Sequence, residues 1–100
     1  MLDKKLKARW VKALRSGRYK QGKGYLQDKD GKNCCLGVLC RISRIKEEMD
    51  HLKIGGGFLF AGAKNFGLRS HVQSILAELN DNDVSSFEAI ADFIESATFI

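Results

Sequence analysis

The chain has no proline, only three cysteines, and no apolar run long enough to span a bilayer. Without proline the commonest helix breaker is missing, which favours a mostly helical fold. The odd cysteine count, in a chain whose first ten residues are charged where a secretory signal would be apolar, favours reduced thiols over a disulfide framework. These absences predict a cytoplasmic protein with no membrane partner.

Acidic residues are almost missing from the first 27 residues, where Asp3 is the single one. The same stretch has nine cations: Lys4, Lys5, Lys7, Arg9, Lys12, Arg15, Arg18, Lys20 and Lys23. The rest of the chain has eight cations and eleven acids, so the net charge of +5 divides into +8 at one end and −3 elsewhere. A field this uneven concentrates anions at the surface and speeds their encounter with it. The sequence therefore predicts a negatively charged partner.

Periodicity predicts helices in both halves of the chain. Leu2, Leu6, Trp10 and Leu14 recur every four residues, which indicates a core-facing helix over residues 2–16 that ends at Gly17. From residue 34 the sequence is apolar on all sides for two turns and then amphipathic to about residue 49, as expected of a helix in the middle of the core.

Two more helices are expected near the C-terminus. The first runs from Ser70 to Leu79, and one face carries Val72, Ile75, Leu76 and Leu79. Residues 80–83 read as a turn. The serines at 85 and 86 fit a capping pattern in two registers, so the last helix is expected to begin after Ser85 or after Ser86. Its inward face is expected to hold Phe87, Ile90, Ala91, Ile94 and Ala97.

The remaining segments complete the fold prediction. Asp30-Gly31 is a strong turn signal, so residues 24–35 are expected to form a small β-hairpin. Residues 55–57 are glycines that read as a connector, and the Phe-rich residues 58–66 after them are core, interface or lid; if exposed, they indicate a homo-oligomer. The whole, residues 1–100, is predicted to be one domain. Its fold class is mainly α (α+β), a compact bundle of about four helices with that hairpin.

Several spaced motifs agree in order with a known group of proteins. They are W-x-x-A-L-R-S-G-x-Y-x-Q at 10–21, C-C-L-G-V-L-C at 34–40, L-N-D at 79–81 and S-F-x-x-I-A-D-x-I-E at 86–95. With these motifs the chain resembles a family of small, uncharacterised proteins of bacteriophages and prophages. The resemblance implies an accessory protein acting inside a bacterial cell, and such proteins are often non-enzymatic. It supplies no catalytic residues.

The cysteines have three interpretations. Cys34, Cys35 and Cys40 are small core hydrophobes, or zinc ligands completed by His51 or His71, or reactive thiols. Core packing is favoured because the spacing lacks a paired C-x-x-C pattern and the segment is apolar. We therefore expect no metal, no cofactor and no catalytic residue. Residues 80–83 also lack the pattern of a calcium loop, and Asp92 and Glu95 read as a solvated helix face.

The segment from residue 15 to residue 25 is the candidate ligand site. Its cations alternate with glycines, which let backbone N–H groups approach an anion, and with tyrosines that stack on bases. The residues expected to bind are Arg15, Arg18, Tyr19, Lys20, Lys23 and Tyr25. The plainer alternative is a solvated helix end with an adjoining loop, because cations sit favourably at a helix C-terminus.

Three functions remain open. The first is a non-enzymatic phage accessory protein that binds a phosphate-bearing ligand, either nucleic acid or a signalling nucleotide, and so counters host defence. The second is a protein–protein inhibitor of a host nucleic-acid-handling or defence factor, anchored by residues 58–66. The third is an enzyme that uses Cys35 or Cys40. The first is the prediction; the others are its alternatives.

Overall fold

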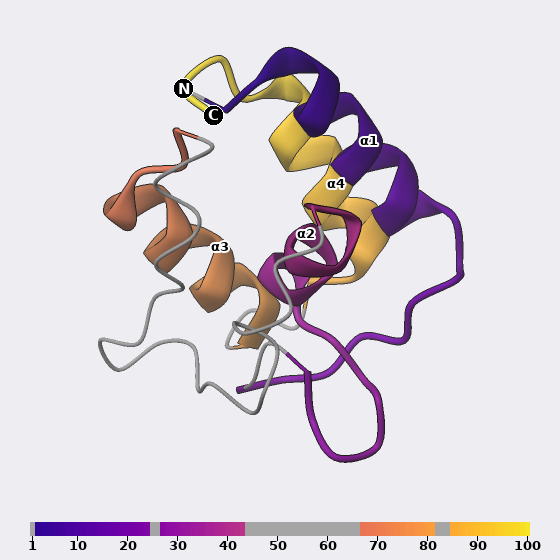
Figure 1. The fold of residues 1–100 in the computed structure, drawn as a ribbon. Helices are drawn as coiled ribbons and strands as arrows, with labels where there is room; N and C mark the ends of the chain where they lie inside the picture. Colours follow the sequence, from indigo (N-terminus) through magenta and orange to yellow (C-terminus); the bar gives the residue numbers. More distant parts are fainter. Residues whose placement is uncertain (1, 25–26, 44–66, 82–84) are drawn as a thin grey trace.

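The computed structural model describes residues 2–24, 27–43, 67–81 and 85–100, and these form four helices and no strand (Figure 1). The helices are α1 (Lys4–Arg15), α2 (Cys35–Ser43), α3 (Ser70–Asp81) and α4 (Phe87–Ser96). The closest packing is in the pairs α1–α2, α2–α3, α3–α4 and α4–α1. α1 and α4 lie side by side, with the two chain ends close together (Figure 1). The prediction of a mainly helical protein with four helices is confirmed.

The first predicted helix is confirmed as α1, with its apolar stripe turned inward. Trp10 is fully buried, and Leu6 and Leu14 lie on the same buried face. The Asp3 carboxylate caps the helix by accepting a hydrogen bond from the Leu6 N–H at 3.0 Å. After the last turn, Gly17 has φ +76°, a left-handed conformation that glycine adopts without steric cost and that ends helices.

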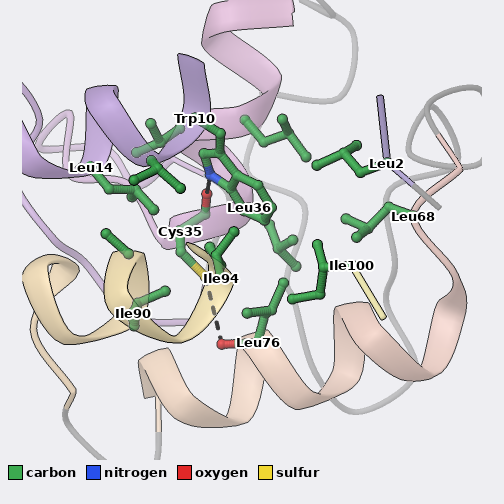
Figure 2. Close-up of a cluster of buried hydrophobic side chains, with 14 of the residues drawn as sticks. Leu2, Trp10, Leu14, Cys35, Leu36, Leu68, Leu76, Ile90, Ile94 and Ile100 are labelled. Carbon is green, nitrogen blue, oxygen red and sulfur yellow. Dashed lines mark hydrogen bonds between the residues drawn. The ribbon is translucent and has the colours of Figure 1, made fainter. Parts of the chain in front are cut away.

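α2 runs through the centre of the core, as its apolar sequence predicts. Every residue from Cys35 to Cys40 is buried, Gly37 included. The Trp10 indole N–H donates to the Cys35 carbonyl at 2.9 Å, and the Cys35 thiol contacts the Leu76 carbonyl at 3.6 Å (Figure 2). All three cysteines are buried, which confirms their interpretation as core residues. The predicted continuation to residue 49 lies mostly outside the described residues.

α3 forms where a helix was expected, and its predicted inward face is right in part. Val72 and Leu76 are buried as predicted, whereas Ile75 is exposed and Leu79 only half-buried. Two polar residues, Gln73 and Asn80, take the buried positions instead. The Gln73 amide nitrogen donates to the Leu68 carbonyl at 3.2 Å, whereas the Gln73 oxygen has no hydrogen-bond partner among the described residues; the bonds of Asn80 are described below. The turn predicted for 80–83 is also displaced, since α3 continues to residue 81; residues 82–84 are outside the described part.

α4 matches its prediction closely. Ser86 is the N-cap, and its hydroxyl accepts a hydrogen bond from the Ala89 N–H at 3.1 Å, which selects one of the two registers. All five residues predicted to face inward are buried: Phe87, Ile90, Ala91, Ile94 and Ala97. Their packing against Trp10, Leu36 and Leu76 joins α4 to the other helices (Figure 2).

The predicted β-hairpin over residues 24–35 is not formed. The turn itself exists, with the Gly31 N–H donating to the Asp28 carbonyl at 3.0 Å. Asn33, however, bonds mainly to the segment before the expected hairpin: its N–H donates to the Lys20 carbonyl at 2.8 Å, and its carbonyl accepts from the Gly22 N–H at 2.7 Å. Only isolated bridges result, to Gln21 and Gln27. The bridge to Gln27 is antiparallel, as a hairpin requires, but it stays isolated, and the bridge to Gln21 is parallel.

Within the described part of the chain, no helix is long and apolar enough to cross a membrane.

Candidate anion-binding surface

The cations predicted to bind a ligand after α1 are exposed. Arg18, Lys20 and Lys23 all project from the loop that follows the helix, and none of them forms an ion pair with the described residues. Tyr19 is half-buried and packs against the hydrophobic core, so only part of its ring is open to a ligand. Tyr25, the sixth predicted residue, lies outside the described residues.

A buried side chain that the sequence interpretation missed holds this loop in place. Asn80 is completely buried at the end of α3. Its amide nitrogen donates to the Gly22 carbonyl at 2.8 Å, and its oxygen accepts from the Gln21 amide at 3.0 Å and from the Cys35 N–H at 3.2 Å. The loop, α2 and α3 therefore meet at one amide. The sequence spacing could have indicated this burial, because residue 80 follows Val72 and Leu76 at four-residue intervals and so shares their helix face.

Position 22 also requires a glycine for a steric reason. A Cβ at this position would lie 2.8 Å from the Cβ of Lys32 and 3.2 Å from the Asp28 carboxylate. The two limbs of the loop approach this closely only because residue 22 has no side chain. The loop is thus fixed at residues 21 and 22, between the exposed cations Lys20 and Lys23.

Arg15, which was expected to bind the ligand, is occupied by three carboxylates of α4. Its guanidinium donates two hydrogen bonds to Glu95, at 3.1 and 3.2 Å, and one to Asp92, while Glu88 lies 3.7 Å away. The bonds to Glu95 and Asp92 raise the pKa of Arg15 further above its already high ordinary value. Asp92 and Glu95 remain largely exposed, but they hold Arg15 rather than forming a plain solvated face.

Two other cations of α1 are bound to the ends of neighbouring helices. The Lys7 ammonium donates to the Ala97 carbonyl at 2.8 Å, at the C-cap of α4, and the Arg9 guanidinium donates to the Ile42 carbonyl at 2.8 Å, near the end of α2. The contact to Ala97 places a cation at the negative end of the α4 dipole.

Lys4, Lys5 and Lys12 have no such structural partner. All three are exposed, and no ion pair or hydrogen bond links their ammonium groups to the described residues. Lys4 and Lys5 stand in the first turn of α1, which has no acid at all. Cations are unfavourable there by about 0.3–1 kcal/mol each, because the helix dipole is positive at this end. Helix stability therefore does not explain why lysines stand at these two positions.

A pocket of about 330 Å³ lies on the side of α1 that faces α4. Ala8 and Val11 supply its apolar lining, and Lys4, Lys7 and Lys12 supply positive charge. Arg15 and Glu95, already joined to each other, also line it. The sequence interpretation named Arg15 but did not find the pocket. Glu95, the acidic residue of the lining, is 80 positions from Arg15 in the sequence, so no local pattern connects the two.

The cysteines offer little chemistry. Burial raises the pKa of Cys34 to about 12 and that of Cys35 well above its ordinary value, so neither forms a thiolate readily at neutral pH. His71, the described histidine, is exposed at the start of α3. The described residues contain no cluster of His, Cys, Asp or Glu that would hold a metal ion. His51 lies outside them.

A family model described as "Domain of unknown function (DUF8296)" matches residues 2–54, just over half of the chain, and the chain belongs to this family. The matched part contains α1, the loop with the exposed cations and α2, so it includes most of the candidate surface. Neither the curated proteins nor the solved structures show a match to the chain.

Proposed function

We propose that this protein is a non-enzymatic module that binds a phosphate-bearing ligand, nucleic acid or nucleotide, through α1 and the loop that follows it. One observation carries the proposal. Residues 1–27 have a net charge of +8, and among their described cations only Arg15 is neutralised by ion pairs. The exposed cations are Lys4, Lys5, Lys12, Arg18, Lys20 and Lys23.

The arrangement suits a ligand with several phosphates. Lys5 and Lys12 lie on the exposed side of α1, and Arg18, Lys20 and Lys23 continue from its C-terminal end. Each phosphate contact releases counterions from a nucleic acid, so affinity should fall steeply with salt, with a slope of roughly −0.7 per phosphate for a single strand. Tyr19, half-buried between Arg18 and Lys20 in the sequence, would contact a base with the part of its ring that is open.

The biological setting is part of the proposal and is supported by the motif resemblance. A small basic protein of a phage or prophage, in the host cytoplasm, would shield nucleic acid or sequester a signalling nucleotide from a defence system. Neither role requires catalysis. Of the two residues in the cysteine-dependent alternative, Cys35 has a raised pKa and Cys40 is fully buried, which favours a non-enzymatic protein.

The protein–protein inhibitor is the other outcome that an experiment must separate. Its proposed anchor, residues 58–66, lies outside the described residues, so no described contact favours it. Under this alternative the isolated protein binds no nucleic acid and forms a stoichiometric complex with one host protein.

The test is the fluorescence anisotropy of a labelled oligothymidylate of about ten nucleotides, titrated with the protein at several salt concentrations. The charge-reversed variant Arg18→Glu/Lys20→Glu should lose at least about tenfold in affinity and show a shallower salt slope. The matched control is Arg41→Glu/Arg69→Glu, which changes the net charge equally at two exposed positions on α2 and just before α3.

If the control loses as much affinity as the loop variant, only the overall charge matters and the assigned surface is wrong. If the unmodified protein does not bind in low salt, the proposal of a nucleic-acid ligand fails. Mass spectrometry of natively purified protein then distinguishes a co-purified nucleotide from a single host protein.

A further inference from the structure

We infer that the pocket between α1 and α4 is a binding site for a nucleoside monophosphate. The inference rests on the proposed function and gives the ligand's chemical class and its place. Three features support it: a positively charged side, an apolar lining of limited size, and a carboxylate with unused acceptor capacity.

The positive side is formed by Lys4, Lys7 and Lys12. Lys7 is held by its hydrogen bond to the Ala97 carbonyl at 2.8 Å, which uses one of its three N–H donors and leaves two for a ligand. Lys4 and Lys12 have no partner among the described residues. Three ammonium groups around one space match a phosphate monoester, which carries close to two negative charges at neutral pH.

The apolar lining limits the size and shape of the ligand. Ala8 and Val11 present methyl groups between the lysines, and Val11 is itself almost fully buried. A volume of about 330 Å³ is near the lower end of the range for small-molecule sites. The pocket has room for one sugar and base beside a phosphate, and a longer chain would have to leave it along the exposed cations.

Glu95 supplies the complementary group. Its two oxygens accept the Arg15 hydrogen bonds at 3.1 and 3.2 Å. A carboxylate has about four acceptor positions, so two remain for donors on a ligand. Ribose hydroxyls and the exocyclic amines of bases are such donors. A sulfate ion has none, and inorganic phosphate has only the O–H groups on the phosphorus itself, so a nucleotide, with donors away from its phosphate, suits Glu95 better than a bare anion.

The experiment titrates AMP, adenosine and inorganic phosphate into ¹⁵N-labelled protein and follows the amide signals of Ala8 and Lys12. AMP should bind more tightly than either of its parts. Binding should also weaken as the pH falls below about 6, where the phosphate gains its second proton.

Two variants separate the pocket from the general surface charge. Ala8→Phe adds a ring to the exposed lining of the pocket without changing any charge, and Ala8→Ser, its control, keeps the pocket open; serine and phenylalanine have similar helix propensities. Ala8→Phe should weaken AMP binding at least about tenfold, whereas Ala8→Ser should stay within about twofold. Both should retain oligothymidylate binding.

The outcomes distinguish the two proposals. If oligothymidylate binds and AMP does not, or if Ala8→Phe binds AMP as well as Ala8→Ser does, the pocket inference is wrong and the proposed function stands. If neither ligand binds, the proposed function fails together with the inference. The expected pattern, loss of AMP binding in Ala8→Phe alone, supports both.

Discussion

Replacing Asn80 with alanine removes the side chain on which three parts of the fold converge. Its amide contacts the loop at Gly22 and Gln21 and the first residue of α2 at Cys35. The Gln21 amide keeps a second partner, the Ser85 carbonyl at 2.6 Å. The Gly22 carbonyl and the Cys35 N–H are left without one.

The size of the effect follows from those two groups. An unsatisfied buried polar group costs about 1–3 kcal/mol, so two of them predict a loss of about 3 kcal/mol for Asn80→Ala, and more if no water enters. The measurement is urea unfolding followed by the fluorescence of the single tryptophan, Trp10, which is fully buried in the native protein. Glu78→Ala, an exposed change on the same helix, is the control and should stay within about 0.5 kcal/mol.

A loss below about 1 kcal/mol in Asn80→Ala would show that the loop and α2 do not depend on this amide. The argument that places the exposed cations by fixing residues 21 and 22 would then be wrong. A loss of the expected size should also weaken oligothymidylate binding, because Lys20 and Lys23 are then no longer held at their positions beside the fixed residues.

Three further predictions concern the rest of the fold. Arg15→Gln should lower the urea midpoint slightly in dilute buffer, and high salt should remove the difference, because the contacts with α4 are exposed; a difference that persists in high salt contradicts this. Ser86→Ala should cost about 1 kcal/mol through loss of the α4 N-cap, and an unchanged unfolding curve would refute the cap. Burial raises the pKa of Cys34 from 9.0 to about 12, so its contribution to stability is complete below pH 9 and declines above it as the unfolded thiol ionises. When the pH is raised from 9 to 10, the free energy of unfolding of Cys34→Ala should therefore fall by less than that of the unmodified protein.

The helices at the two ends of the chain were predictable because their signals agree. In α1 the stripe of Leu6, Trp10 and Leu14 coincides with a cap before it and Gly17 after it. In α4 a serine cap precedes five inward residues, all of which are buried. Local propensity and hydrophobic period favour the same structure in both, which is the situation in which sequence patterns are most informative.

The errors occur where a polar side chain or backbone group finds a distant partner. Asn80 was placed in a turn because asparagine favours turns, yet its hydrogen bonds to the loop and to α2 keep it in a helix and in the core. In place of the expected hairpin there are isolated bridges, and Asn33 pairs with the backbone at residues 20 and 22. Periodicity reports which positions are apolar and contains no information about such pairings.

The candidate surface was predictable in part, for a similar reason. The excess of positive charge is a property of composition and is visible in the sequence. That Arg15 is held by Asp92 and Glu95, while Lys4 and Lys12 have no partner among the described residues, depends on α4 lying beside α1. Residues about 80 positions apart decide which cations a ligand can reach.

The central claim is that an anion binds to α1 and the loop after it. The most direct measurement is a ¹H–¹⁵N NMR titration of the full chain with a short oligothymidylate, repeated at about 50 and 200 mM salt. The account predicts that the largest shifts fall between Lys4 and Lys23 and that the higher salt weakens binding strongly. Shifts concentrated on α3, or no shift in low salt, would contradict it.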